Sequence, residues 1–227
     1  MRHSKLKNLF LLVAIFLSSC GGGGESPSPP VIVPANIMEA SSWEIGPIID
    51  GQNLSVGMPL NPAIHPEGWS IDIPYSTAGA GHVHYITVPT NSLSGKTKVT
   101  LTARLEMKDG VRLAPVKSPD SPSLLTLYFQ RKGDNWSAQG EYEAYRWYAS
   151  FATRVDLKSG DYVMEANFDQ NWTAILTSSR TTNPTGFQNA INDAGRIGFV
   201  LGGHDGLGHG VFATGPARLV VKSFKIE

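Results

Sequence analysis

The stretch Thr97-Lys98-Val99-Thr100-Leu101-Thr102-Ala103-Arg104-Leu105-Glu106-Met107 decides the fold. Apolar side chains at every second position, from Val99 to Met107, alternate with polar or charged ones. A period of two is that of a β-strand, because successive side chains of a strand point to opposite faces of the sheet. The segment therefore predicts a strand with one face in a core and the other in solvent.

Similar patterns recur from Ser42 onward. Clear strands are expected over 125–129 and 162–168, and shorter ones over 69–73, 82–88, 142–151, 173–177, 197–201, 210–213 and 217–226. Turn-forming pairs such as Asn61-Pro62 and Asp109-Gly110 separate them. One short segment, 186–194, is expected to be helical. Many short strands divided by Gly and Pro turns predict an all-β fold, a β-sandwich of the jelly-roll type, over residues 42–227.

The aromatic residues divide into expected core and expected surface. Trp43, Trp69 and Trp172 are predicted to lie in the core. If residues 142–151 form one strand, Tyr145, Trp147 and Phe151 share a face, which we interpret as a core face.

The amino terminus has the order of parts of a secretory signal. Basic residues at positions 2, 5 and 7 precede an uncharged apolar run over 9–17. That run is too short to span a bilayer, which needs roughly 20 apolar residues. Residues 1–19 are therefore predicted to be a signal peptide.

The sequence Leu17-Ser18-Ser19-Cys20 resembles the lipobox of bacterial lipoproteins. The resemblance implies cleavage before Cys20 and a diacylglyceryl thioether on its sulfur, so that the partner at this end is a membrane. Gly21 follows, which by the same resemblance favours the outer membrane over the inner one. The alternative is an ordinary signal peptide with a chance cysteine.

Residues 20–41 are predicted to be a disordered tether. Four glycines at 21–24 make its first part flexible, and prolines at 27, 29, 30 and 34 make the second part extended. A spacer that reaches a partner and a simple leash are both compatible with this composition.

Charge and cysteine content exclude some classes of function. Residues 1–19 hold three of the 19 basic residues and none of the 19 acidic ones, so the chain after cleavage has a net charge of about −3. Nucleic acid is therefore not expected as a partner, because phosphate neutralisation needs a basic surface. Cys20 is the single cysteine, so no intramolecular disulfide can form.

A second resemblance concerns residues 140–227. The segments Arg146-Trp147-Tyr148, Asn171-Trp172, 198–203, Gly208-His209-Gly210-Val211 and 217–221 resemble a group of uncharacterised exported bacterial proteins. That group has a galactose-binding-like or carbohydrate-binding-module jelly roll. The resemblance implies the fold, and it assigns no catalytic residue.

Trp136 and three residues after it are the candidate carbohydrate-binding residues. Trp136 lies in the polar, Gly-bounded segment 132–140, the expected tip of a hairpin, where an exposed ring can stack on a sugar. On one expected strand, Tyr142, Arg146 and Tyr148 share the polar face. The alternatives are that Trp136 tucks under the loop and that the stem of Arg146 only covers the sheet.

Candidate metal ligands are fewer. His82 and His84 place two imidazoles on one face of an expected strand, a spacing found in zinc and iron sites, but no carboxylate follows until Glu106. In the Gly-rich segment 202–210, Asp205 and backbone carbonyls could hold a structural calcium ion. Surface or packed histidines and a tight connection between strands are the alternatives.

Three functions are compatible with these features. The first is a lipid-anchored, non-catalytic carbohydrate-binding protein of the cell envelope. The second is an envelope structural or protein-interaction lipoprotein. The third is a polysaccharide lyase or hydrolase, with His82 or His84 beside Tyr148 as base and acid. No Gly-x-Ser-x-Gly or His-Glu-x-x-His motif and no cysteine nucleophile is present, so an enzyme is the less favoured interpretation.

Overall fold

Strand β7 (Lys98–Met107) forms as its alternating sequence predicts. Every second side chain from Val99 to Leu105 is buried, and the side chains between them are partly exposed. The computed structural model describes residues 39–75 and 83–227. Within these residues the chain is an all-β sandwich with one short α-helix, which confirms the predicted fold class.

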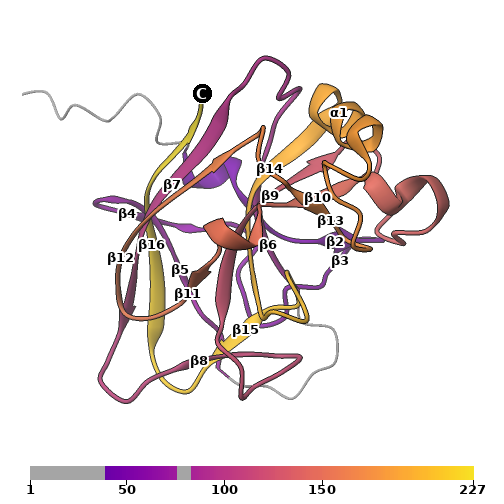
Figure 1. Cartoon of the computed structure of the whole chain (residues 1–227). Coiled ribbons are helices and arrows are strands. Elements are labelled where there is room, and N and C mark those ends of the chain that lie inside the picture. The colour runs from indigo at the N-terminus through magenta and orange to yellow at the C-terminus, as the bar shows by residue number, and fades with distance from the viewer. Residues whose placement is uncertain (1–38, 76–82) are drawn as a thin grey trace, which may run out of the picture. The chain divides into compact units, whose positions relative to one another are not determined.

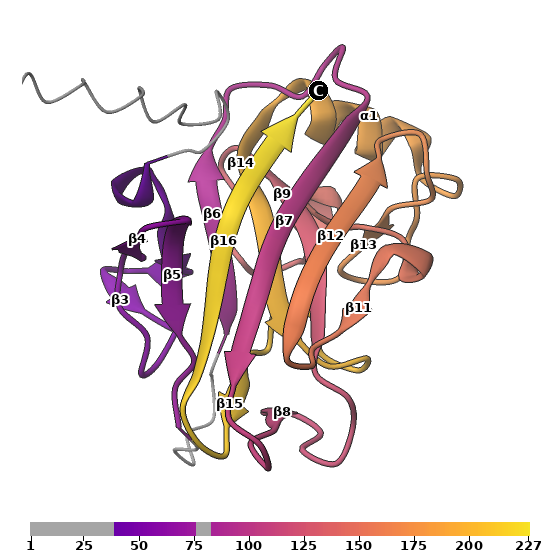
Figure 2. The ribbon, with the colours of Figure 1, turned by 90° about the vertical axis from the view of Figure 1, so that its left-hand side faces the viewer.

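Two antiparallel sheets supply the two layers (Figures 1 and 2). The five-stranded sheet has the order β12 (Gly160–Asn167), β7, β16 (Ala217–Ile226), β5 (Gly68–Asp72) and β4 (Ala63–His65). The seven-stranded sheet has the order β1 (Glu44–Gly46), β6 (His84–Pro89), β14 (Ala194–Gly202), β9 (Leu124–Arg131), β10 (Arg146–Tyr148) and β13 (Thr173–Ala174), with β11 (Val155–Asp156) paired to β9. The chain crosses repeatedly between the sheets, as in a jelly roll.

Two small ribbons complete the strands. They pair β2 (Ile48–Ile49) with β3 (Gln52–Asn53), and β8 (Leu113–Pro115) with β15 (Val211–Ala213). The described residues also contain three short 3-10 helices: η1 (Ala40–Ser42), η2 (Gly140–Ala144) and η3 (Phe151–Thr153).

The core lies between the inner faces of the two sheets. Alternate side chains of β7 meet Leu125, Leu127 and Phe129 of β9 in one buried cluster. Trp43, Trp69 and Trp172 are each at most 1% exposed, as predicted, and the rings of Trp43 and Trp69 lie 4.7 Å apart. Burial of apolar area at about 25 cal/mol per Å² makes this layer the main source of stability.

Helix α1 (Pro184–Asn192) covers one end of the sandwich (Figure 2). It begins two residues earlier than the sequence pattern indicated, because Asn183 Oδ1 accepts a hydrogen bond from Gly186 N at 2.9 Å and Pro184 stands at the first helical position. The helix buries Phe187, whose ring centroid lies 5.0 Å from that of Trp147 in the core.

The strand predicted over 142–151 is the largest error. Only Arg146–Tyr148 pairs as β10, and 3-10 helices occupy the residues on either side. The alternation of aromatic residues there is coincidental, because Tyr142 and Phe151 lie on these helices. Phe151, predicted for the core, is 64% exposed.

The predicted signal peptide, Cys20 and the predicted tether as far as residue 38 lie outside the described residues. The end of the predicted tether overlaps η1, where Ala40 packs against the core. No helix in the described part of the chain is long and apolar enough to cross a membrane.

Candidate functional site

The outer face of the seven-stranded sheet carries a second, smaller buried cluster. It is made by Tyr85 of β6, Tyr128 of β9, Tyr148 of β10 and Val200 of β14. Tyr85 and Tyr148 join hydroxyls at 2.7 Å, and the Tyr128 ring lies about 5 Å from each of their rings. Burial raises the pKa of all three tyrosines, so their hydroxyls stay protonated at neutral pH.

Trp136 packs on this cluster from the loop after β9. Its ring makes an edge contact with Tyr85, with centroids 5.0 Å apart, and the Arg146 guanidinium lies 4.9 Å from its centroid. Trp136 has φ of +64°, an uncommon conformation for a residue with a Cβ. Such a conformation persists only where its surroundings fix it, and it is often found at binding sites.

A buried ion pair fixes the Trp136 backbone. Asp134 Oδ2 and Arg146 Nε are 2.9 Å apart, and the two side chains are 0% and 5% exposed. Asp134 Oδ1 accepts the Trp136 N–H at 3.0 Å, and Arg146 Nη2 donates to the Trp136 carbonyl at 2.9 Å. Gln130 also donates to Asp134, at 2.9 Å. The pair therefore holds Trp136 by both polar groups of its own peptide backbone.

Burial and pairing act in opposite directions on this ion pair. Burial raises the pKa of the Asp134 carboxyl, and the positive charge of Arg146 limits that rise. Burial by itself lowers the pKa of the Arg146 guanidinium, but Asp134 and the neighbouring tyrosines raise it overall. Arg146 is therefore a cation beneath the Trp136 ring.

A groove of about 510 Å³ lies beside Trp136, over strands β1, β6, β14 and β9. Aromatic and polar side chains line it together, among them Trp136, Tyr85, Glu44, Thr87, Gln130 and Arg196. Arg196 forms an ion pair with Glu44 at 3.2 Å and donates to Thr87 Oγ1 at 2.8 Å. The groove therefore offers a partly exposed indole next to hydrogen-bonding groups that are already held in place.

The four predicted carbohydrate-binding residues do not form the expected surface. Trp136, Arg146 and Tyr148 do come together, but Arg146 is 4% and Tyr148 2% exposed, so both lie beneath Trp136 and do not face solvent. Tyr142 lies on η2 and packs on Tyr145, with ring centroids 4.9 Å apart. The predicted shared strand face is wrong, because the strand begins only at Arg146.

Sequence reasoning missed several residues of this site. They are Tyr85 on β6, Tyr128 and Gln130 on β9, and Asp134 in the loop after β9. Tyr85 follows His84 directly, and Tyr128 lies between the apolar Leu127 and Phe129, where strand alternation alone could have placed it on the outer face.

Of the predicted metal ligands, His84 and Asp205 lie in the described residues, and each accepts a hydrogen bond. Among residues 39–75 and 83–227, no three His, Cys, Asp or Glu side chains are arranged to hold a metal ion. His84 is fully buried and its Nδ1 accepts the Val211 N–H at 3.2 Å. Asp205 accepts a hydrogen bond from Ser118 at 2.6 Å. His82 lies outside the described residues, and the calcium site stays a prediction.

The structure also does not bring His84 and Tyr148, a predicted base and acid of a lyase, together. Tyr85 belongs to the outer cluster with Tyr148, and His84, one residue earlier on β6, points to the opposite face of the sheet. A base at His84 and an acid at Tyr148 cannot meet across the sheet, so this half of the enzyme hypothesis is wrong.

Neither a protein-family model nor a curated protein matches this chain. Among solved structures, the xylan-binding module CBM15 is similar to it, with 11% sequence identity and a TM-score of 0.39. The match covers 83% of this chain and 95% of the module. An identity and a TM-score this low transfer neither a ligand nor a residue role to this chain.

Proposed function

We propose that this chain is a lipid-anchored, non-catalytic protein that binds a glycan in the groove beside Trp136. The observation that carries the proposal is the fixed position of the Trp136 ring next to the polar lining of that groove. A sugar ring has an apolar C–H face and a rim of hydroxyls, so it needs an aromatic surface and hydrogen-bonding groups together. Glu44 and Arg196 supply an acceptor and a donor from β1 and β14, the two strands that flank β6.

Three of the four sequence candidates then have different roles, and Tyr142 does not line the groove. Trp136 contacts the ligand, and Arg146 and Tyr148 act as positioning residues because they are buried beneath it. Preorganisation of this kind strengthens binding, because the ligand does not have to order the loop itself.

A glycan array with the full chain in detergent tests the proposal, followed by calorimetric titration of the best-bound oligosaccharide. Trp136→Ala is expected to weaken binding tenfold or more, about 1.4 kcal/mol, and Trp136→Phe to weaken it less. Glu143→Ala, an exposed residue on neighbouring η2, is the matched control and should bind as the unaltered chain does. Absence of binding to every glycan by a folded chain would contradict the proposal.

The same array tests the calcium prediction. If Asp205 and carbonyls of the loop over 202–210 hold a calcium ion that orders the site, EDTA should reduce binding and added calcium should restore it. Binding that is insensitive to EDTA would contradict a calcium ion that orders the site.

Lipid attachment at Cys20 would place this groove at the cell envelope, with the outer membrane favoured. Metabolic labelling with palmitate should mark the unaltered chain and not Cys20→Ser. Equal labelling of both chains would contradict the anchor.

One observation favours an envelope protein as an alternative partner. Ile64 is 89% exposed on β4, one of the two edge strands of the five-stranded sheet. Edge strands and exposed apolar residues are common at protein contacts. Retained glycan binding in Ile64→Ser, with loss of a crosslinked envelope protein, would show that both partners exist.

A further inference from the structure

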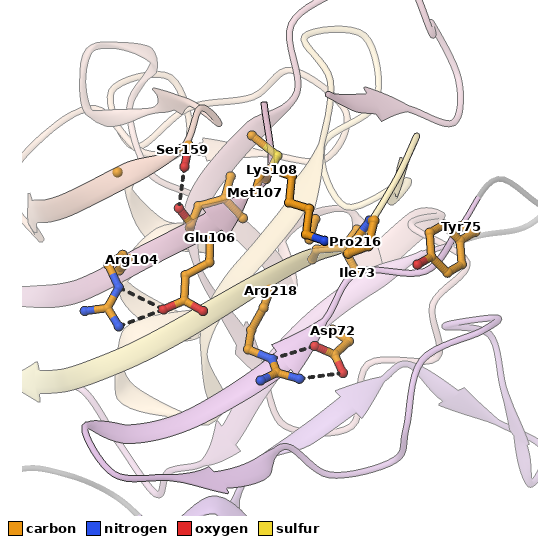
Figure 3. Close-up of a pocket in the computed structure, with 13 residues that line it drawn as sticks. Asp72, Ile73, Tyr75, Arg104, Glu106, Met107, Lys108, Ser159, Pro216 and Arg218 are labelled. Atoms are coloured by element: carbon orange, nitrogen blue, oxygen red, sulfur yellow. Dashed lines mark hydrogen bonds and ion pairs between the residues drawn. The ribbon is translucent and has the colours of Figure 1, made fainter. Parts of the chain in front are cut away.

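A second polar arrangement lies on the outer face of the five-stranded sheet, the other layer of the sandwich. The strand register places Asp72 of β5, Arg218 of β16 and Glu106 of β7 in one row across three strands. Arg218 donates from Nε to Asp72 Oδ1 at 2.6 Å and from Nη2 to Oδ2 at 3.1 Å. Arg104, on the same face of β7, donates to Glu106 Oε1 from Nε at 3.0 Å and from Nη2 at 2.7 Å (Figure 3).

This row borders a cavity of about 670 Å³. Its apolar wall comes from the strand ends and the turns beside them, with Ile73, Tyr75, Met107 and Pro216 (Figure 3). Tyr75 is 58% exposed, so its ring is accessible. Cavities of roughly 300–1,000 Å³ are of the size that holds small ligands. The cavity therefore joins an accessible ring and an aliphatic wall to a row of charged groups.

The hydrogen-bonding groups of the row are only partly used. In the described part of the chain, Arg218 Nη1 and Glu106 Oε2 have no hydrogen-bond partner. A guanidinium has five N–H donors and a carboxylate about four acceptor positions, so both retain capacity. The pairing with Asp72 and Arg104 fixes the planes of both groups. One donor and one acceptor thus come from two cavity-lining residues on neighbouring strands.

The charges of the row largely cancel. Arg218 is paired with Asp72, and Arg104 is paired with Glu106 and with Glu67, which lies outside the cavity lining. Within the described residues, Lys108 is the lining side chain with a charge and no ion pair. A ligand therefore gains little from carrying a charge, but it gains from hydroxyls that can both donate and accept.

We propose that this pocket is a second binding site, for a neutral saccharide unit. The Tyr75 ring and the Met107 and Pro216 side chains contact the C–H face of the sugar, and Arg218 Nη1 and Glu106 Oε2 bind adjacent hydroxyls. The inference does not depend on the groove at Trp136, because the two sites lie on different sheets and share no lining residue.

Two sites on opposite layers would let one molecule hold two glycan segments. Linking two binding events raises the apparent affinity for a ligand that reaches both sites, without any new contact. Where a single chain cannot reach both, the protein crosslinks neighbouring glycans.

The test is calorimetric titration of the full chain in detergent with two neutral probes, xylohexaose and cellohexaose, and one acidic probe, trigalacturonate. Tyr75→Ala and Glu106→Gln should each weaken binding at the second site tenfold or more, and leave the site at Trp136 unchanged. Trp136→Ala should retain the second site. Val163→Ala, which is 74% exposed on β12 and outside the cavity lining, is the matched control and should leave both sites unchanged.

The result expected is two sites for a neutral probe in the unaltered chain and one in Tyr75→Ala. The proposal is overturned if Tyr75→Ala and Glu106→Gln bind as the unaltered chain does, or if Trp136→Ala removes all binding. It is also overturned if neither neutral probe binds, or if only trigalacturonate binds and Lys108→Gln abolishes that binding. Binding at Trp136 alone would leave the proposed function intact while excluding the second site.

Discussion

Asp134 and Arg146 form a buried ion pair that also fixes the backbone of Trp136. Asp134 accepts the Trp136 N–H, and Arg146 donates to the Trp136 carbonyl. Asp134 comes from the loop after β9, and Arg146 is the first residue of β10. A pair of this kind costs desolvation energy, and its net contribution to stability is small compared with the loss when one partner is removed. Its structural effect is to fix an indole in a left-handed backbone conformation at the edge of a groove.

Removal of one partner should therefore be costly. Asp134→Ala leaves the Arg146 guanidinium buried without its carboxylate, and we expect the free energy of unfolding to fall by about 3–5 kcal/mol. Asp72→Ala is the matched control, because its partner Arg218 is 47% exposed and exposed pairs contribute about 1 kcal/mol or less. Urea denaturation measures both.

A double variant keeps this prediction testable if Asp134→Ala does not fold. Asp134→Ala combined with Arg146→Met removes both charges, and it should recover much of the lost stability. Equal losses for Asp134→Ala and Asp72→Ala would show that the buried pair has no special role.

The tyrosine cluster gives a second, paired prediction. Tyr128 is fully buried, and its hydroxyl has no hydrogen-bond partner in the described part of the chain. Tyr128→Phe should leave stability unchanged or raise it, because it removes an unpaired buried polar group. Tyr148→Phe should lower stability by about 1–3 kcal/mol, because it leaves the Tyr85 hydroxyl buried without its partner. In thermal and urea unfolding only Tyr148→Phe should lose stability, and an equal loss in Tyr128→Phe would contradict the hydrogen-bond assignment.

The fold was predictable because the sequence signals of its strands are local. The site was not predictable, because it depends on contacts between residues that lie apart in the chain. The alternation around Val99 and Leu101 specifies a strand without reference to any other segment. The Trp136 site depends on the pairing of Asp134 with Arg146, twelve positions later, and on Tyr85, which is far away in the chain. Single-sequence patterns carry no information on such pairing, so Trp136 was found as an exposed-ring candidate while its supports were misplaced.

The error at Tyr142 and Phe151 has a specific physical origin. Aromatic residues at alternating positions predict a strand only if the backbone stays extended, and here 3-10 turns begin at Gly140 and at Phe151. Gly140 has φ of +58°, which breaks the extended run before Tyr142. Gly140 was the signal in the sequence that the backbone turns there, and the strand begins only after this turn, at Arg146.

Alanine substitutions at two glycines with nearly the same φ distinguish the stability cost of backbone strain from that of a packing clash. Gly208 has φ of +76°, and a Cβ there would lie 2.6 Å from the Tyr85 ring. Gly95 has φ of +77°, and no atom of the described residues, its two chain neighbours aside, lies within 4 Å of its Cβ position. Gly95→Ala should cost about 1 kcal/mol of stability from backbone conformation alone. Gly208→Ala should cost about 1–3 kcal/mol more, because it also displaces Tyr85. Urea unfolding measures the difference, and equal costs would show that the Gly-rich loop does not pack tightly on the cluster.

The ion pairs on the five-stranded sheet should make stability depend on acid pH. Hydrogen bonds from Arg104, and then from Lys222, lower the pKa of Glu67 from 4.5 to about 2. A carboxyl whose pKa is lower in the folded state contributes stability above pH 4.5, and this contribution is lost as the pH falls toward 2. Glu67→Gln should therefore lower the free energy of unfolding at pH 7, and the two chains should converge near pH 2.

Salt separates this effect from a packing change at the same position. In 1 M NaCl the Debye length is about 3 Å, so the difference between Glu67→Gln and the unaltered chain should shrink at pH 7. Urea denaturation at pH 7, 4.5 and 2.5, each with and without salt, gives all the required values. A difference that is as large at pH 2.5 as at pH 7, or that salt leaves unchanged, would mean that Glu67 acts through its shape and not through its charge.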